Sequence, residues 1–261
     1  MTEFTTSSRG DRVAYDLRGS GPALVFVAGA GPFRAIDPWT TETAERAAAA
    51  GITTLVFDRL GRGESPAAGV LDLDRELDAL RAVIEVVGGS AVLCGHSSGC
   101  SISLKAADAG LPVTGLALWE APLASPADPT REWAAEIERR IDAGELEAAT
   151  EHYMRDMPPE WLATMKGSAQ WPMIIAGIVS LRADAQSLAW AQTALEHGEL
   201  TGIDVPVLAT YGTVTFPEMP RAAAALVEAI PQAAQKAVPG ADHAWQPEPM
   251  AAELVAFVRR C

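Results

Sequence analysis

The sequence is short of positive charge. It has 20 Lys and Arg against 34 Asp and Glu among 261 residues, which gives a formal net charge of −14. Because nucleic acids and anionic membranes bind basic surfaces, this balance argues against both as partners. With 49% hydrophobic and 21% charged residues, the composition is that of a globular protein and not of a disordered one. These figures exclude classes of partner without indicating a function.

Cysteine is scarce, and long apolar runs are missing. The three cysteines cannot all pair, and none lies in a CxxC motif or a His/Cys cluster with metal-ligand spacing. The longest apolar run, Ala23–Ala30, is too short to span a bilayer. The polar segment Met1–Arg12 does not resemble a signal peptide. We expect a cytoplasmic protein with free, buried thiols and no bound metal.

Buried strands and amphipathic helices alternate along the first half of the chain. Ala23–Val27 and Ile52–Phe57 are typical of fully buried strands, and apolar residues recur at helical spacing from Leu73 to Val87. A strand, a helix and a strand follow at 91–94, 98–109 and 113–119. The alternation resumes after residue 202, with strands at 205–211 and 235–238 and helices at 218–229 and 250–260.

This order predicts an α/β fold whose mostly parallel, twisted sheet has helices on both faces, preceded by two short antiparallel strands at 3–7 and 12–18. Residues 122–202 interrupt the alternation with helical patterns only. We therefore predict a helical lid over 122–202, inserted between the two parts of one core, 1–121 and 203–261. Open α/β sheets bind ligands at the carboxyl ends of their strands, so the lid is expected there.

Large apolar side chains are concentrated in and beside this insertion. Five of the seven tryptophans lie between residues 119 and 190. Aromatic and Met side chains suit an apolar or aromatic small-molecule substrate. The expected pocket residues are Trp119, Met154, Trp161, Trp171 and Trp190.

The stretch 95–99 reads Gly-His-Ser-Ser-Gly, between a predicted strand and a predicted helix. A G-x-S-x-G pattern in this context is typical of a nucleophile elbow: Ser97 sits on a strained turn, and side chains in place of the glycines would collide with neighbouring backbone. The helix start offers the N–H of Ser98 to a developing oxyanion. In these residues the chain resembles the α/β-hydrolase superfamily, and the resemblance covers nearly its whole length.

Two further stretches carry this resemblance. Residues 58–65, Asp-Arg-Leu-Gly-Arg-Gly-Glu-Ser, resemble the family's D-x-x-G-x-G-x-S loop after its fourth strand. Residues 27–32, Val-Ala-Gly-Ala-Gly-Pro, resemble its oxyanion loop, with Ala28 where the family usually has His. The resemblance implies an oxyanion hole formed by the N–H of Ala30, or of Gly29 beside it, together with that of Ser98. A backbone N–H does not require the missing His.

A serine hydroxyl needs a base, and the chain has only four histidines. His243 follows the last predicted strand, where the superfamily has its catalytic histidine. His152 and His197 fall in the insertion, and we interpret His96, inside the elbow, as a packing or pocket residue. His243 is therefore the predicted base.

The usual acid of the triad is missing. Thr215, which cannot carry a negative charge, occupies the position where the superfamily usually has Asp. Glu120 ends the strand 113–119, and a carboxylate at the carboxyl end of a central strand is hard to explain structurally, so we predict it as the acid. Glu218 is the alternative, although acids also favour a first helical turn. Asp242 adjoins His243 and would need an awkward backbone to reach it.

With its acid after the sixth strand, the chain resembles lactonases similar to the zearalenone-degrading enzymes. The implied function is hydrolysis of a carboxylic ester or lactone of a small, largely apolar or aromatic substrate through an acyl-enzyme, without any cofactor. A C–C bond hydrolase, a cofactor-free perhydrolase and a catalytically weak ligand sensor stay open as alternatives. Ser at position 97 argues against the dehalogenase and epoxide hydrolase chemistry that uses Asp there. The sequence does not set the oligomeric state, for which a homodimer is one alternative.

Overall fold

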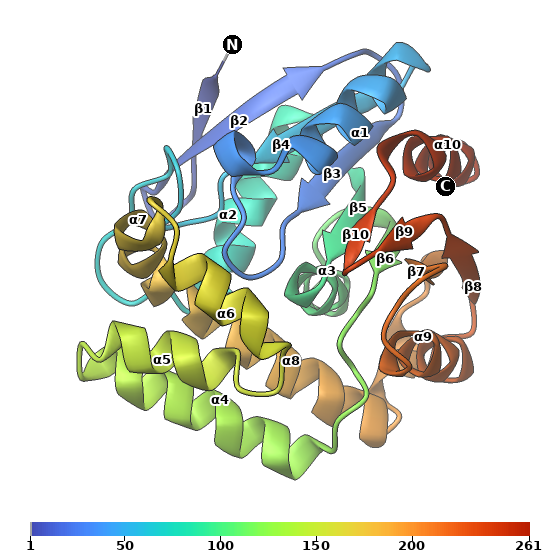
Figure 1. The fold of residues 1–261 in the computed structure, drawn as a ribbon. Coiled ribbons are helices and arrows are strands. Elements are labelled where there is room, and N and C mark those ends of the chain that lie inside the picture. Colours follow the sequence, from blue (N-terminus) through green and yellow to red (C-terminus); the bar gives the residue numbers. More distant parts are fainter. Residues whose placement is uncertain (1) are drawn as a thin grey trace.

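An eight-stranded sheet runs through the centre of the computed structural model, which describes residues 2–261 (Figure 1). Its strands are β1 (Glu3–Thr6), β2 (Arg12–Arg18), β3 (Ala23–Val27), β4 (Thr53–Phe57), β5 (Ala91–His96), β6 (Val113–Trp119), β7 (Val207–Gly212) and β8 (Ala233–Val238). They are ordered β1-β2-β4-β3-β5-β6-β7-β8, with β1 antiparallel to β2, β2 antiparallel to β4 and every other pair parallel. The predicted α/β class with a mostly parallel sheet is confirmed.

Helices cover both faces of this sheet. The helices of the core are α1 (Pro38–Ala49), α2 (Leu73–Val86), α3 (Ser98–Asp108), α9 (Glu218–Ala229) and α10 (Pro247–Val258). In β3, Leu24 and Phe26 pack into the cluster that holds residues of α1 and α10, whereas Val25 and Val27 pack into the cluster that holds residues of α2 and α3. Burial on both sides explains why β3 reads as an unbroken apolar run.

Local signals fix where the first helices begin. Pro38 opens α1, and the side chain of Asp37 accepts a hydrogen bond of 3.0 Å from the Thr40 N–H. Asp72 caps α2 in the same way through the Arg75 N–H, at 2.9 Å. Each cap satisfies an N–H that the first helical turn leaves without a partner.

Between β6 and β7, where the sequence interrupts the alternation with helical patterns, the chain forms five further α-helices. They are α4 (Ala127–Asp142), α5 (Leu146–Tyr153), α6 (Pro159–Lys166), α7 (Trp171–Ala176) and α8 (Leu181–Glu196). In Figure 1, α4, α5 and α6 lie together below the sheet, and α7 lies to the left of α2. The last helix differs from these, because α8 packs against α2 and α3 and buries much of its length. By contrast, α6 and α7 contain no fully buried residue.

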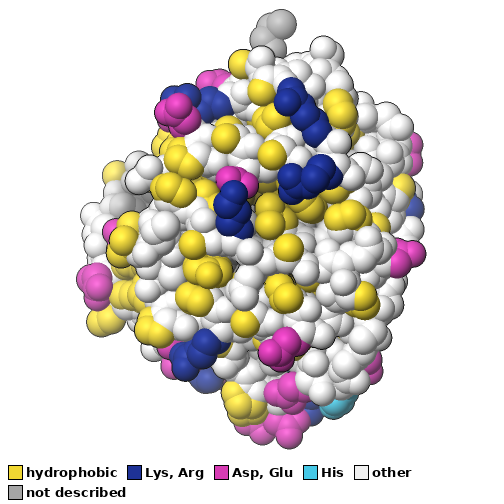
Figure 2. All heavy atoms as spheres, turned by 90° about the vertical axis from the view of Figure 1, so that its right-hand side faces the viewer, with side chains coloured by type: hydrophobic (Ala, Val, Ile, Leu, Met, Phe, Trp, Pro, Cys, Tyr) yellow, Lys and Arg dark blue, Asp and Glu magenta, His cyan; other side chains and the backbone are white. Residues whose placement is uncertain are grey.

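Charge is unevenly spread over the surface. Figure 2 shows the face that includes the right-hand side of Figure 1, where apolar side chains form small groups and several Lys and Arg side chains lie in the upper half. Arg46 and Arg259 flank a shallow groove between α1 and α10. No helix formed by residues 2–261 combines the length and the apolar character that crossing a bilayer requires.

The cysteines are free. Cys94 and Cys100 are buried, as predicted, and Cys261 is exposed. Burial raises the pKa of the Cys94 and Cys100 thiols. Both are therefore held as unreactive thiols at neutral pH.

Candidate active site

Ser97 lies at the sharp turn between β5 and α3. Its backbone is in an unusual conformation, with φ 55° and ψ −124°, which a residue with a side chain adopts only under constraint. A Cβ atom at Gly95 would lie 2.6 Å from the Gly99 carbonyl oxygen, and one at Gly99 would lie 2.1 Å from the Val27 carbonyl oxygen. The two glycines therefore let the helix approach the strands closely enough to form this turn.

Glu120 follows β6 directly and contacts His243. Its Oε2 lies 2.5 Å from His243 Nδ1, while its Oε1 accepts hydrogen bonds from the Gly212 N–H (2.9 Å) and the Thr215 hydroxyl (2.5 Å). The side chain is 1% exposed. Burial alone would raise the pKa of Glu120, but the bonds from His243, Thr215 and Gly212 outweigh it and hold the pKa below its ordinary value. Glu120 is thus a fixed, ionised carboxylate beside the imidazole.

The other candidate acids lie elsewhere. Thr215, at the position where the resemblance leads one to expect an acid, instead donates to Glu120. Glu218 is exposed at the start of α9 and pairs with Arg221 at 3.2 Å. Asp242 is exposed as well. Among residues 2–261, the only carboxylate paired with His243 is that of Glu120.

His243 lies in a small hairpin between β9 (Gly240–Ala241) and β10 (Ala244–Trp245). Both Asp242 and His243 have a positive φ, at 50° and 66°. The His243 carbonyl oxygen accepts two hydrogen bonds, from His96 Nε2 (2.9 Å) and from the Trp119 indole N–H (3.1 Å). These two donors hold the backbone conformation that directs the imidazole toward Glu120.

The contact of His96 with this hairpin could not be seen in the sequence. Because a carbonyl oxygen only accepts hydrogen bonds, His96 Nε2 must carry the proton. Burial, together with the charge of His243, lowers the pKa of His96 to about 4, so its ring is neutral at neutral pH. The interpretation of His96 as a packing or pocket residue is therefore incomplete: it also donates a hydrogen bond that holds the His243 loop.

The loop after β3 touches the elbow. A Cβ atom at Gly29 would lie 2.8 Å from the His96 carbonyl oxygen and 2.9 Å from Ser97 Cβ, so only glycine fits there. Within residues 2–261, no hydrogen bond engages the N–H of Ala30 or of Gly29. Ser98 is the first residue of α3, and its N–H therefore has no acceptor within the helix. These N–H groups remain available to a substrate oxygen.

Of the five predicted pocket residues, only Trp161 lies beside His243. Its ring centroid, on α6, is 6.5 Å from that of His243 and 5.8 Å from that of Phe216, in the loop after β7. All three side chains are only partly buried. Trp161 and Phe216 thus form an apolar wall next to the imidazole.

The remaining four lie in other surroundings. Trp119 is fully buried on the far side of the His243 loop, edge-on to Trp245, so it supports the loop and does not line a pocket. Met154 is buried in the main core. Trp171 and Trp190 lie next to the ammonium groups of Lys166 and Lys105, at 5.9 and 4.6 Å. The apolar patterns of the insertion did not distinguish these environments.

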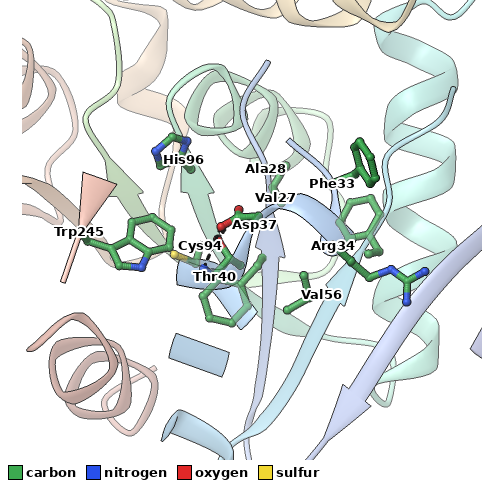
Figure 3. A pocket seen from close by; sticks show the side chains of 12 residues that line it. Val27, Ala28, Phe33, Arg34, Asp37, Thr40, Val56, Cys94, His96 and Trp245 are labelled. Atoms are coloured by element: carbon green, nitrogen blue, oxygen red, sulfur yellow. Dashed lines mark hydrogen bonds between the residues drawn. The ribbon is translucent and has the colours of Figure 1, made fainter. Parts of the chain in front are cut away.

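A small cavity lies under the loop after β3 (Figure 3). It is lined by side chains that include Phe33 and Arg34 on one side and His96 and Trp245 on the other. Its volume of about 10 Å³ is that of a single water site, too small for a substrate. Within residues 2–261, no group of three or more His, Cys, Asp or Glu side chains could hold a metal ion.

Comparison with known proteins identifies the family. A model described as the alpha/beta hydrolase family matches residues 24–257. The chain is 30% identical to an alpha/beta hydrolase of known structure from Sphaerobacter thermophilus, with 98% of this chain and 99% of that chain covered and a TM-score of 0.82.

Two esterases share the fold at lower identity. The esterase from Thermogutta terrifontis is 20% identical (TM-score 0.66; 100% of this chain and 97% of that chain covered), and one from Rhodococcus sp. is 21% identical (TM-score 0.64; 99% and 98% covered). A search of curated protein sequences finds no match. Because the family model spans most of its length, the chain belongs to the alpha/beta hydrolase family.

Proposed function

We propose that the protein is a serine hydrolase that cleaves a carboxylic ester or lactone of a small, largely apolar or aromatic substrate. Ser97 is the nucleophile, His243 the base and Glu120 the acid that orients it. The observation that carries the proposal is the 2.5 Å contact between His243 Nδ1 and a buried carboxylate that is itself held by two donors. A buried carboxylate fixed against an imidazole is the arrangement that a general base requires.

The proposed reaction follows from these roles. Glu120 accepts the Nδ1–H of His243, which leaves Nε2 free to take the proton from Ser97 as its oxygen attacks the substrate carbonyl. The N–H groups of Ala30 and Ser98 stabilise the oxyanion, and His243 returns the proton to the leaving alcohol. Water, activated by His243 in the same way, then hydrolyses the acyl-enzyme.

The apolar wall supports the proposed substrate class. Trp161 and Phe216 offer aromatic surface beside His243. Such surface favours an apolar acyl or alcohol group over a charged one. For a lactone, both groups belong to one ring, and the alcohol stays tethered until water releases the acid.

A fluorophosphonate probe tests the nucleophile. We expect it to label the wild-type protein once, at Ser97, with loss of p-nitrophenyl butyrate hydrolysis in parallel. Ser97→Ala should abolish both, whereas Ser125→Ala, at an exposed serine, should preserve both. A wild-type protein that is neither labelled nor active on short esters and lactones, yet binds an apolar ligand, would refute the proposal in favour of a sensor.

A further inference from the structure

A cluster of four buried charges joins the insertion to the core. Asp184, on α8, pairs with Arg59 Nη1 and Arg62 Nη2, both at 2.6 Å, and Arg59 Nε pairs with Glu76 of α2 at 2.8 Å. All four side chains are at most 3% exposed. The four charges sum to zero, and the free-energy cost of burying each charge is offset by its attraction to its partners. Burial would raise the pKa of Asp184, but Arg59 and Arg62 outweigh it and lower that pKa, so Asp184 is ionised.

The two arginines also hold the oxyanion loop. Arg62 Nη1 donates to the Gly29 carbonyl oxygen at 2.5 Å, and Arg59 Nη1 donates to the carbonyl oxygens of Ala28 (3.1 Å) and Gly29 (3.4 Å). The Gly29 carbonyl and the Ala30 N–H belong to one planar peptide group and point in opposite directions. Fixing that carbonyl therefore fixes the direction of the Ala30 N–H.

Asp184 reaches the other half of the oxyanion hole as well. Its Oδ1 accepts a hydrogen bond of 2.7 Å from the Ser98 hydroxyl. Ser98 is fully buried at the start of α3, and its N–H is the second proposed oxyanion donor. The Asp184 carboxylate thus contacts Ser98, whose N–H is one donor of the proposed oxyanion hole. Through Arg62 it also holds the peptide group that carries the other donor, the Ala30 N–H.

We propose that Asp184 is a positioning residue for the oxyanion hole, and that α8 thereby makes the insertion part of the catalytic machinery and not only a cover for the substrate. The inference rests on the proposed function. Asp184 contacts no substrate atom in this scheme. It acts by holding Ser98 and both arginines, and the arginines hold the peptide group whose N–H faces the oxyanion. An N–H that is misdirected in this way stabilises the transition state less, while substrate binding is little affected.

The test is Asp184→Asn, which keeps the shape of the side chain and removes its charge. We expect kcat for p-nitrophenyl butyrate to fall at least about tenfold with KM nearly unchanged, since loss of one oxyanion donor costs about 10²- to 10³-fold. The Ki of a trifluoromethyl ketone, whose hemiketal oxyanion occupies the same hole, should rise with the loss in kcat/KM. All rates are normalised to active sites titrated with fluorophosphonate.

The matched control lies on the same helix. Arg182 of α8 is also nearly buried but pairs with Glu138 and Asp142 of α4, away from the elbow. Arg182→Met should lower the Tm and leave kcat per titrated site unchanged. Where Asp184→Asn fails to fold, Ser98→Ala removes the hydroxyl that donates to Asp184 and should lower kcat several-fold.

The outcomes separate the two proposals. If Asp184→Asn and Ser98→Ala keep kcat per site and ketone affinity within about twofold of wild type, or change them no more than Arg182→Met does, the positioning role is overturned while the serine hydrolase remains. If the wild-type protein is not labelled by the probe, the proposed function fails, and this inference fails with it.

Discussion

Replacing Glu120 by Gln exchanges one carboxylate oxygen for an NH₂ group, and the surrounding hydrogen bonds determine which way the new amide is oriented. The position of Oε1 receives two donors, the Gly212 N–H and the Thr215 hydroxyl. The amide oxygen must therefore take that position, which turns the NH₂ group toward His243 Nδ1. An NH₂ group donates, so Nδ1 must accept and the imidazole proton must move to Nε2. In that tautomer His243 cannot take the proton of Ser97.

The opposite orientation of the amide is costly. It would aim the NH₂ group at the Gly212 N–H and leave that buried donor without an acceptor, which costs about 1–3 kcal/mol. The Thr215 hydroxyl can turn to accept, but the backbone N–H cannot. At 1.36 kcal/mol per tenfold, the productive orientation is populated about 5- to 150-fold less. The lost carboxylate charge no longer stabilises the imidazolium, and the equivalent change in a Ser-His-Asp triad costs about 10⁴ in kcat. We expect a loss of about 10²- to 10⁴-fold.

The assay is kcat and KM for p-nitrophenyl butyrate at pH 7, normalised by active-site titration. KM should change little, because Glu120 is 1% exposed and does not contact the substrate in the proposed scheme. Glu218→Gln is the matched control: it is the same chemical change at an exposed carboxylate paired with Arg221, and it should leave kcat unchanged. If Glu120→Gln keeps more than about a tenth of kcat, or if Glu218→Gln loses as much, the assignment of the acid is wrong.

Three further results are expected from the same structure. The pKa of His96 is lowered to about 4 from an ordinary 6.5, so between these pH values the unfolded chain binds a proton that the folded chain does not. Acidification through this range should therefore remove up to about 3 kcal/mol of stability, and the stability of His96→Gln, measured by urea titration, should depend less on pH. Gly99→Ala places a Cβ 2.1 Å from the Val27 carbonyl oxygen and should lower the free energy of unfolding by about 1–3 kcal/mol or more, or prevent folding. An unchanged Tm would contradict the close approach of the elbow to β3. Trp161→Ala should raise KM for a naphthyl ester several-fold and leave KM for an acetate ester nearly unchanged. Equal effects on the two KM values would exclude a role of the aromatic wall in substrate specificity.

Residues with strong local signals were predictable. The glycines at 95 and 99 and the apolar runs on either side specify the strand, the turn and the helix around Ser97 from neighbouring residues alone. Glu120 and His243 lie far apart in sequence, yet they come after β6 and β8, whose carboxyl ends the parallel sheet brings to one edge. The hydrophobic pattern indicates where the strands end, and strand–helix–strand connections make the strands parallel, so their carboxyl ends lie on the same edge.

Residues whose role depends on side-chain direction were not predictable. The donation from His96 and Trp119 to the His243 carbonyl depends on a hairpin of four paired residues that leaves no periodic signal. Likewise, Trp171 and Trp190 are residues of the type that lines apolar pockets, but in the structure their rings lie beside lysine ammonium groups. Hydrophobic periodicity indicates that a face packs against something and does not say against what.

Glu120 and Asp184 divide two tasks between two buried carboxylates, one orienting the base and the other the oxyanion hole. The net charge of −14 gives no hint of either, because it counts exposed acids that salt screens and that touch no reacting group. Both are buried and accept three hydrogen bonds, and each accepts one of them from a residue of the proposed site, His243 for Glu120 and Ser98 for Asp184. Both tasks serve the same tetrahedral transition state, so their losses should not add: once Glu120→Gln has disabled the base, adding Asp184→Asn should cost less than it does alone. Full additivity of the two losses would mean that Asp184 acts on a step separate from the one that His243 catalyses.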